Sequence, residues 1–84
     1  MSYVSLDDEY LRYMKRLRDI EDELKKVNPS IAVFLHREIE FYSELWNRTS
    51  TLDVDERLKI LGYLSSKVRQ WEYILRELKY KHRR

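Results

Sequence analysis

Two side chains with the spacing of a metal site lie in the middle of the chain. His36 and Glu40 are four residues apart, and on a helix this spacing places both on one face, where they can reach the same ion. A usable site needs three or four ligands, and the sequence offers no convincing third. The chain has no cysteine, which excludes thiolate metal sites and disulfides. We therefore expect no metal and no other cofactor.

A second candidate for chemistry is Glu38, a carboxylate among apolar residues. At 100° per residue from Ile31, the apolar positions around it fall within about half of the helix circumference. These positions are Phe34, Leu35, Ile39, Phe41, Tyr42, Leu45 and Trp46. The width of this arc predicts a helix that packs against two neighbours. A carboxylate in such a place pairs, takes up a proton or faces a gap, and in a cleft it can be catalytic. Small bundles have little cleft volume, so we expect a structural contact with Arg16, Ser65 or a tyrosine hydroxyl.

The third pattern is an alternation of arginine and tyrosine near the C-terminus. Arg69, Tyr73, Arg76, Tyr80 and Arg83 follow one another at spacings of four and three, so they share one helix face. This pairing is common at protein interfaces, suits nucleic acid without sequence reading, and also occurs on helix faces that are only solvated. For a protein partner we expect Tyr73, Leu75, Arg76, Leu78, Lys79, Tyr80 and Arg83. For nucleic acid, the alternative set is Arg69, Tyr73, Arg76, Lys79, Tyr80, Lys81, Arg83 and Arg84.

Three helices must position these residues. Apolar residues from Leu6 to Val27 repeat at spacings of four and three, which predicts a helix over residues 6–27. Asn28-Pro29 ends it, because proline disfavours helical geometry before it and suits the start of the next helix. We predict the second helix over 29–48. Cap-forming residues over 48–53 separate it from a third helix over 53–81.

Helices joined by such short turns predict a single all-α domain over 1–84, an up-down-up three-helix bundle. Residues 1–5 lack a pattern and should be loose. The third helix is the longest, at about 40 Å against about 27 Å for the second. Residues 74–84 are therefore expected to project as a basic helix end. Leu75 and Leu78 should then be uncovered, which favours a partner.

Composition restricts the class of protein further. Basic residues number 17 and acidic residues 15; residues 67–84 hold 7 and 2 of these, or +5, and the first 66 hold 10 and 13, or −3. This asymmetry is typical of a tail that meets nucleic acid or an acidic partner. No apolar run reaches the roughly 20 residues of a membrane span, and no secretory pattern begins the chain. We predict a cytoplasmic protein with no membrane contact.

The favoured function is a non-catalytic protein-interaction module, an accessory subunit that docks onto a larger protein. Abundant charged residues at i,i+4 spacing indicate a thermophile-like protein. An archaeal or viral source is a hypothesis on this composition, and an archaeal replication or transcription assembly is one hypothesis for the larger complex. The alternative is a nucleic-acid-binding protein; a small helical enzyme is least favoured, because few criteria of a catalytic site are met. A homodimer also fits the helix periodicity.

Overall fold

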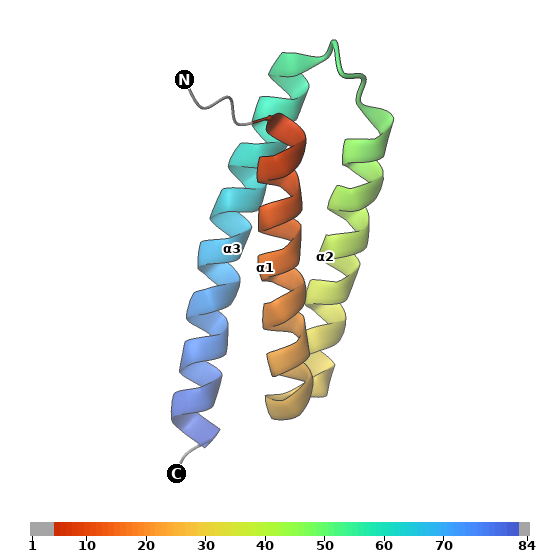
Figure 1. Cartoon of the computed structure of the whole chain (residues 1–84). Helices are drawn as coiled ribbons and strands as arrows, with labels where there is room; N and C mark the ends of the chain where they lie inside the picture. The colour runs from red at the N-terminus through yellow and green to blue at the C-terminus, as the bar shows by residue number, and fades with distance from the viewer. Residues whose placement is uncertain (1–4, 83–84) are drawn as a thin grey trace.

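The protein folds into three helices, each antiparallel to the one before it in the chain, as the sequence predicts (Figure 1). The computed structural model describes residues 5–82. Helix α1 spans Leu6–Val27, α2 spans Pro29–Arg48 and α3 spans Val54–His82. In Figure 1 the chain runs down through α1, up through α2 and down through α3, so α1 and α3 are parallel. This arrangement confirms the all-α, up-down-up three-helix bundle.

Each helix end is formed by side chains that the sequence places there. The Ser5 hydroxyl accepts a hydrogen bond from the Asp8 N–H at 3.1 Å and caps α1, so Ser5 does not belong to the loose segment expected over 1–5. Residues 1–4 lie outside the described part of the chain. Asn28 serves two helices: its N–H donates to the Leu24 carbonyl at 2.6 Å, and its side chain accepts from the Ile31 N–H at 3.3 Å. One residue therefore closes α1 and opens α2.

The core is a single cluster along the axis of the bundle. It includes side chains from all three helices, and the most completely buried of them are Met14, Leu17, Ile20, Leu24, Leu35 and Leu64. Trp46 stacks on Tyr10 with ring centroids 4.4 Å apart and an interplanar angle of 8°. The predicted seam of α1 is confirmed at Tyr10, Leu17, Ile20 and Leu24. Met14, which lies beside that seam, is buried as well.

Helix α3 packs mainly against α1 and much less against α2. Two ion pairs join the parallel helices: Arg16 Nη2 to Glu72 Oε2 at 3.2 Å, and Lys79 Nζ to Glu23 Oε1 at 3.0 Å. In both pairs the residue of α3 comes 56 positions after its partner on α1 (72 − 16 and 79 − 23). The same offset places Val27, the last residue of α1, about level with His82, the last residue of α3. The tip of α3 reaches only a little beyond the α1–α2 turn (Figure 1).

The expectation that Leu75 and Leu78 are uncovered is wrong. Leu75 is 6% exposed and belongs to the core, and Leu78 is partly buried against it. The sequence argument compared the length of α3 with that of α2 alone. The parallel helix α1 is the larger neighbour, and it accompanies α3 almost to its end.

No helix within the described residues is both long enough and apolar enough to cross a membrane.

Candidate interaction surfaces

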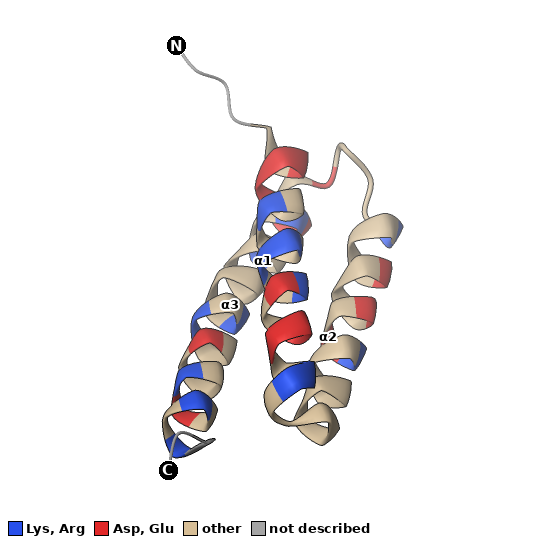
Figure 2. Ribbon diagram, turned by 60° about the horizontal axis from the view of Figure 1, so that its bottom comes forward, with Lys and Arg blue, Asp and Glu red and all other residues tan. Residues whose placement is uncertain are grey.

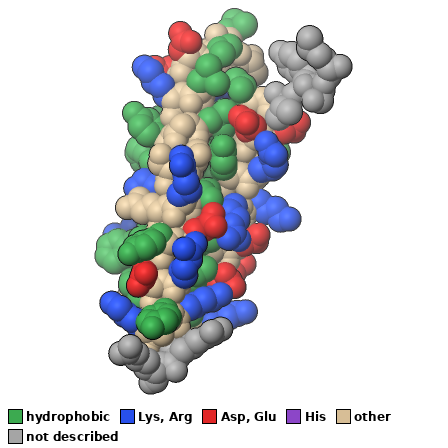
Figure 3. All heavy atoms as spheres, turned by 90° about the vertical axis from the view of Figure 1, so that its left-hand side faces the viewer, with side chains coloured by type: hydrophobic (Ala, Val, Ile, Leu, Met, Phe, Trp, Pro, Cys, Tyr) green, Lys and Arg blue, Asp and Glu red, His purple; other side chains and the backbone are tan. Residues whose placement is uncertain are grey.

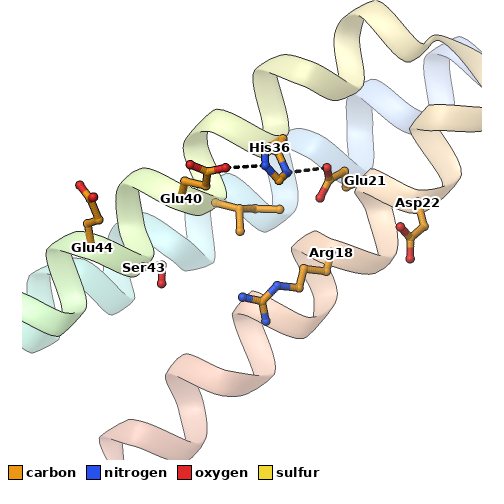
Figure 4. Close-up of a pocket in the computed structure, with 8 residues that line it drawn as sticks. Arg18, Glu21, Asp22, His36, Glu40, Ser43 and Glu44 are labelled. Carbon is orange, nitrogen blue, oxygen red and sulfur yellow. Dashed lines mark hydrogen bonds and ion pairs between the residues drawn. The ribbon is translucent and has the colours of Figure 1, made fainter.

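An open groove of about 420 Å³ lies between α1 and α2, and seven of the eight residues that line it have polar side chains (Figure 4). His36 projects into the groove from α2, between two carboxylates. Its Nδ1 lies 2.9 Å from Glu21 Oε2 on α1, and its Nε2 lies 2.5 Å from Glu40 Oε1 on α2. Lys25 Nζ lies 3.8 Å from the same oxygen of Glu21. The imidazole therefore bridges the two helices.

The spacing of His36 and Glu40 is that of a metal site, but the geometry is that of a side-chain bridge in which the imidazole lies between two carboxylates. The two carboxylates approach opposite nitrogens of one ring, so they do not converge on a common point (Figure 4). In the described part of the chain, no group of three or more His, Cys, Asp or Glu side chains is placed to hold a metal ion. Sequence reasoning missed Glu21, which is buried. Its position beside Ile20 on the inner side of α1 was the available signal.

Glu38 makes the structural contact that the sequence predicts, but with other partners. Its Oε2 accepts a hydrogen bond from Trp71 Nε1 at 2.9 Å, and its Oε1 lies 3.2 Å from Lys67 Nζ. The expected partner Arg16 pairs with Glu72 instead. On α3, Lys67 and Trp71 take the place of the expected Ser65, because α3 is displaced by about one turn from the level estimated by folding the chain at residues 50–51.

The hydroxyl of Tyr42 lies in the same region, between α2 and α3. Burial raises the pKa of Tyr42, and the negative charge of Glu38 and the neighbouring Tyr63 raise it further, while the cation of Lys67 opposes them. Tyr42 is thus held in its neutral form next to an ion pair. These groups form a polar seam along the less closely packed side of the bundle.

The arginine and tyrosine side chains of α3 share one exposed face, which we call the Tyr/Arg stripe: Arg69, Tyr73, Arg76 and Tyr80. Tyr73 is 60% and Tyr80 is 66% exposed. Among the described residues, neither Arg69 nor Arg76 forms an ion pair. Figure 3 shows basic side chains interspersed with hydrophobic ones on the side of the molecule that α3 covers.

Other residues predicted for this region are placed differently. Leu75 and Leu78 point to the core, and Lys79 is held by Glu23. Lys81 is exposed, and Arg83 and Arg84 lie outside the described residues. Basic residues are nevertheless frequent along the C-terminal half of α3, whereas α2 has few (Figure 2). Of the predicted partner-binding residues, Tyr73, Arg76 and Tyr80 lie together on the exposed side of α3.

A second exposed surface, which the sequence did not predict, lies on the outer edge of α2. The wide apolar arc was expected to be covered by two neighbours, but Phe34 is 60% and Phe41 is 59% exposed. Ala32 takes a place in the core instead. Because α2 and α3 pack least closely of the three helix pairs, the described residues leave the part of the arc that turns outward beside α3 exposed. The excessive width of the arc was the signal of this exposed row.

Comparison of the chain with protein-family models, with curated proteins and with solved structures finds no match.

Proposed function

We propose that this protein is a non-catalytic helical interaction module, an accessory subunit in the cytoplasm that docks onto a larger protein through the Tyr/Arg stripe. A nucleic-acid-handling assembly, such as an archaeal replication or transcription complex, is the context that the basic helix end favours. The observation that supports the proposal is the exposure of Tyr73 and Tyr80 in one row with two arginines that have no carboxylate partner among residues 5–82.

Tyrosine and arginine, together with tryptophan, are enriched among the few residues that dominate the binding energy at protein interfaces. Tyrosine provides a large amphipathic surface, and a guanidinium group can bind a carboxylate through two parallel hydrogen bonds. The partner surface that fits the stripe is acidic and contains apolar pockets for the two rings. By contrast, the two carboxylates singled out in the sequence are engaged within the bundle: Glu38 with Trp71, and Glu40 with His36.

The proposal is tested by site-specific photocrosslinking in cells that produce the whole chain. A benzophenone side chain in place of Tyr73 should give a discrete adduct with a larger protein. The same group in place of Leu52, which is 90% exposed in the α2–α3 turn, should not. Reversal of both charges, Arg69→Glu with Arg76→Glu, should abolish the adduct at position 73, whereas Arg48→Glu on α2 should leave it. Absence of an adduct, or an adduct that survives the double reversal, would contradict the proposal.

Nucleic acid is the second candidate for the same stripe. The guanidinium groups of Arg69 and Arg76, which form no ion pair with any residue that the structure describes, favour it. Both point away from α2. Lys67 contacts Glu38 and so marks the side of α3 that faces α2. Arg69 and Arg76, two and nine residues later, lie about half a turn around the helix from Lys67. Their phosphate contacts would release counterions, so affinity should fall linearly with salt on logarithmic axes. We expect Arg69→Ala with Arg76→Ala to reduce that slope by about 2. Arg48→Ala is the matched control, and no binding to single strands or duplex at low salt would exclude this function.

A further inference from the structure

The outer edge of α2 exposes an aromatic row that the bundle does not use. The chain contains two phenylalanines, and both are about three-fifths exposed, Phe34 at 60% and Phe41 at 59%. They are seven residues apart, so they lie on one side of α2, about 10.5 Å from each other along its axis. Most other apolar side chains of α2 are buried or partly buried. An exposed row of this kind on a small monomer indicates an interaction site.

Two charges of opposite sign lie along one flank of this row. Arg37 is exposed and forms no ion pair or hydrogen bond among the described residues. Glu44, seven residues later on the same flank, has a side chain that is 75% exposed, and its one ion pair within the described part of the chain is with Arg48, at 3.9 Å. An isolated cation and a weakly held anion thus stand at opposite ends of one short row.

This arrangement is complementary to itself. When two copies of a helix pack antiparallel about a two-fold axis, residues at the same level have numbers with a constant sum, and each flank meets the same flank of the other copy. A sum of 81 (37 + 44) places Arg37 level with Glu44 of the second copy, and it does so twice. The axis then passes at 40.5, next to Phe41, and brings the two Phe41 rings almost level with each other.

We propose that the outer edge of α2 is the interface of a two-fold symmetric homodimer, with Phe41 at the axis and Arg37 paired with Glu44 of the second copy. The rings supply apolar area at the centre, and the two ion pairs set the direction and register of the helices. Tyr63, an exposed residue of α3 that lies close enough to Tyr42 to affect its ionisation, extends the aromatic surface on the α3 side.

The dimer leaves the Tyr/Arg stripe available. Lys67 marks the side of α3 that faces α2, and Arg69 and Arg76 lie on the opposite side of that helix. The homodimer is therefore independent of the proposed docking function, and either can fail without the other. Both surfaces could be occupied at the same time.

Sedimentation equilibrium of the whole chain tests the proposal, because the dimer has twice the 10.5 kDa mass of the chain. Arg37→Glu alone and Glu44→Arg alone each place like charges opposite one another twice. We expect each to raise the dissociation constant about tenfold or more. The double variant, Arg37→Glu with Glu44→Arg, restores opposite charges and should return to within about threefold of the wild type.

Two further variants separate the interface from general surface effects. Phe41→Asp should give a monomer with an unchanged helical circular dichroism spectrum, since this side chain is outside the core. Leu52→Asp, in the turn between α2 and α3, should leave the dimer intact. A monomer at every accessible concentration would overturn the proposal. So would a double charge reversal that is no better than the single ones, which would exclude the Arg37–Glu44 register.

Discussion

The guanidinium group of Arg57 lies over the indole ring of Trp46, with its carbon 4.6 Å from the ring centroid. The same indole stacks on Tyr10, at a centroid distance of 4.4 Å. Asp7 accepts hydrogen bonds from both Trp46 Nε1 and Arg57 Nη1, each at 3.2 Å. Arg57 Nε also donates to the Thr49 hydroxyl at 3.0 Å. Side chains from all three helices thus close the end of the bundle that holds the α2–α3 turn.

Removal of the Arg57 side chain should destabilise the protein more than removal of any exposed arginine. Arg57 is buried, and Arg57→Ala removes both the cation over the ring and the hydrogen bonds to Asp7 and Thr49. We expect the free energy of unfolding in urea to fall by about 2–3 kcal/mol. Arg48→Ala, at an exposed and weakly paired position, should change it by less than about 0.5 kcal/mol.

Arg57→Lys sharpens this test. Lysine keeps the charge but loses the planar group that stacks on the indole and donates in two directions. An intermediate loss of stability is therefore expected. Equal stability of Arg57→Lys and the wild type would show that charge alone accounts for the contribution.

The helices and turns of this protein can be predicted from the sequence because their signals are local. The spacing of apolar residues from Leu6 to Val27, the cap of Asn28 and the ring of Pro29 each act over one or two turns. The bounds of α1 and α2 agree with the prediction, and α3 is shifted by a single residue, from 53–81 to Val54–His82. Glu38 was also correctly expected to make a structural contact.

The errors concern the relative levels of helices and the choice of neighbour, which depend on packing between distant segments. A displacement of α3 by about one turn replaced Ser65 by Trp71 and Lys67 as partners of Glu38. Arg16 of α1 pairs with Glu72 of α3 instead of with Glu38. The partner of His36 on α1, Glu21, is 15 residues away in the sequence. Apolar character alone could not distinguish Leu35, which is buried, from Phe34, which is exposed.

Because of the hydrogen bond from Trp71 to Glu38, two substitutions of Glu38 by residues of similar size should differ in their effect on stability. Glu38→Gln retains an oxygen that can accept from Trp71 Nε1, and loses only the charge next to Lys67. Glu38→Leu leaves the partly buried indole N–H without an acceptor, which costs about 1–3 kcal/mol. We expect urea unfolding to show that order, with Glu38→Gln close to the wild type. The opposite order would show that this hydrogen bond contributes little to stability.

Stability at high pH should depend on Tyr42. Burial raises its pKa in the folded state above the ordinary value of 10.0. Above about pH 10 the unfolded chain therefore loses the tyrosine proton while the folded protein retains it, and the free energy of unfolding falls as pH rises through the folded-state pKa. One retained proton gives a slope of at most about 1.4 kcal/mol per pH unit. Tyr42→Phe removes this contribution.

Urea unfolding at intervals from pH 9 upward measures the difference. The wild type should lose more stability than Tyr42→Phe above about pH 10. Near pH 9, where the tyrosine is protonated in both states, the free energies of unfolding of the two proteins should change in parallel. Absorbance of the phenolate near 295 nm should show one fewer late-titrating tyrosine in the variant. Parallel curves over the whole range would contradict the expected role of Tyr42.

Gly62 offers a stabilising substitution at the centre of an exposed helix face. A Cβ atom at this position meets no atom within 4 Å, so alanine fits without any shift of its neighbours. Alanine is preferred over glycine in a helix interior, and Gly62→Ala should raise the free energy of unfolding by about 0.5–1 kcal/mol. Thermal unfolding should shift upward by several degrees, on the order of 4–8 °C per kcal/mol for a domain of this size.

Ser66→Ala, one turn later on α3 and also exposed, is the matched control for Gly62→Ala. It should give a smaller gain, because serine is already closer to alanine in helix propensity than glycine is. Loss of stability in Gly62→Ala, with the expected gain in Ser66→Ala, would mean that another chain approaches the helix backbone at Gly62 in solution. Repeating both measurements at several protein concentrations distinguishes a second copy of the chain, whose effect grows with concentration, from a change within the monomer.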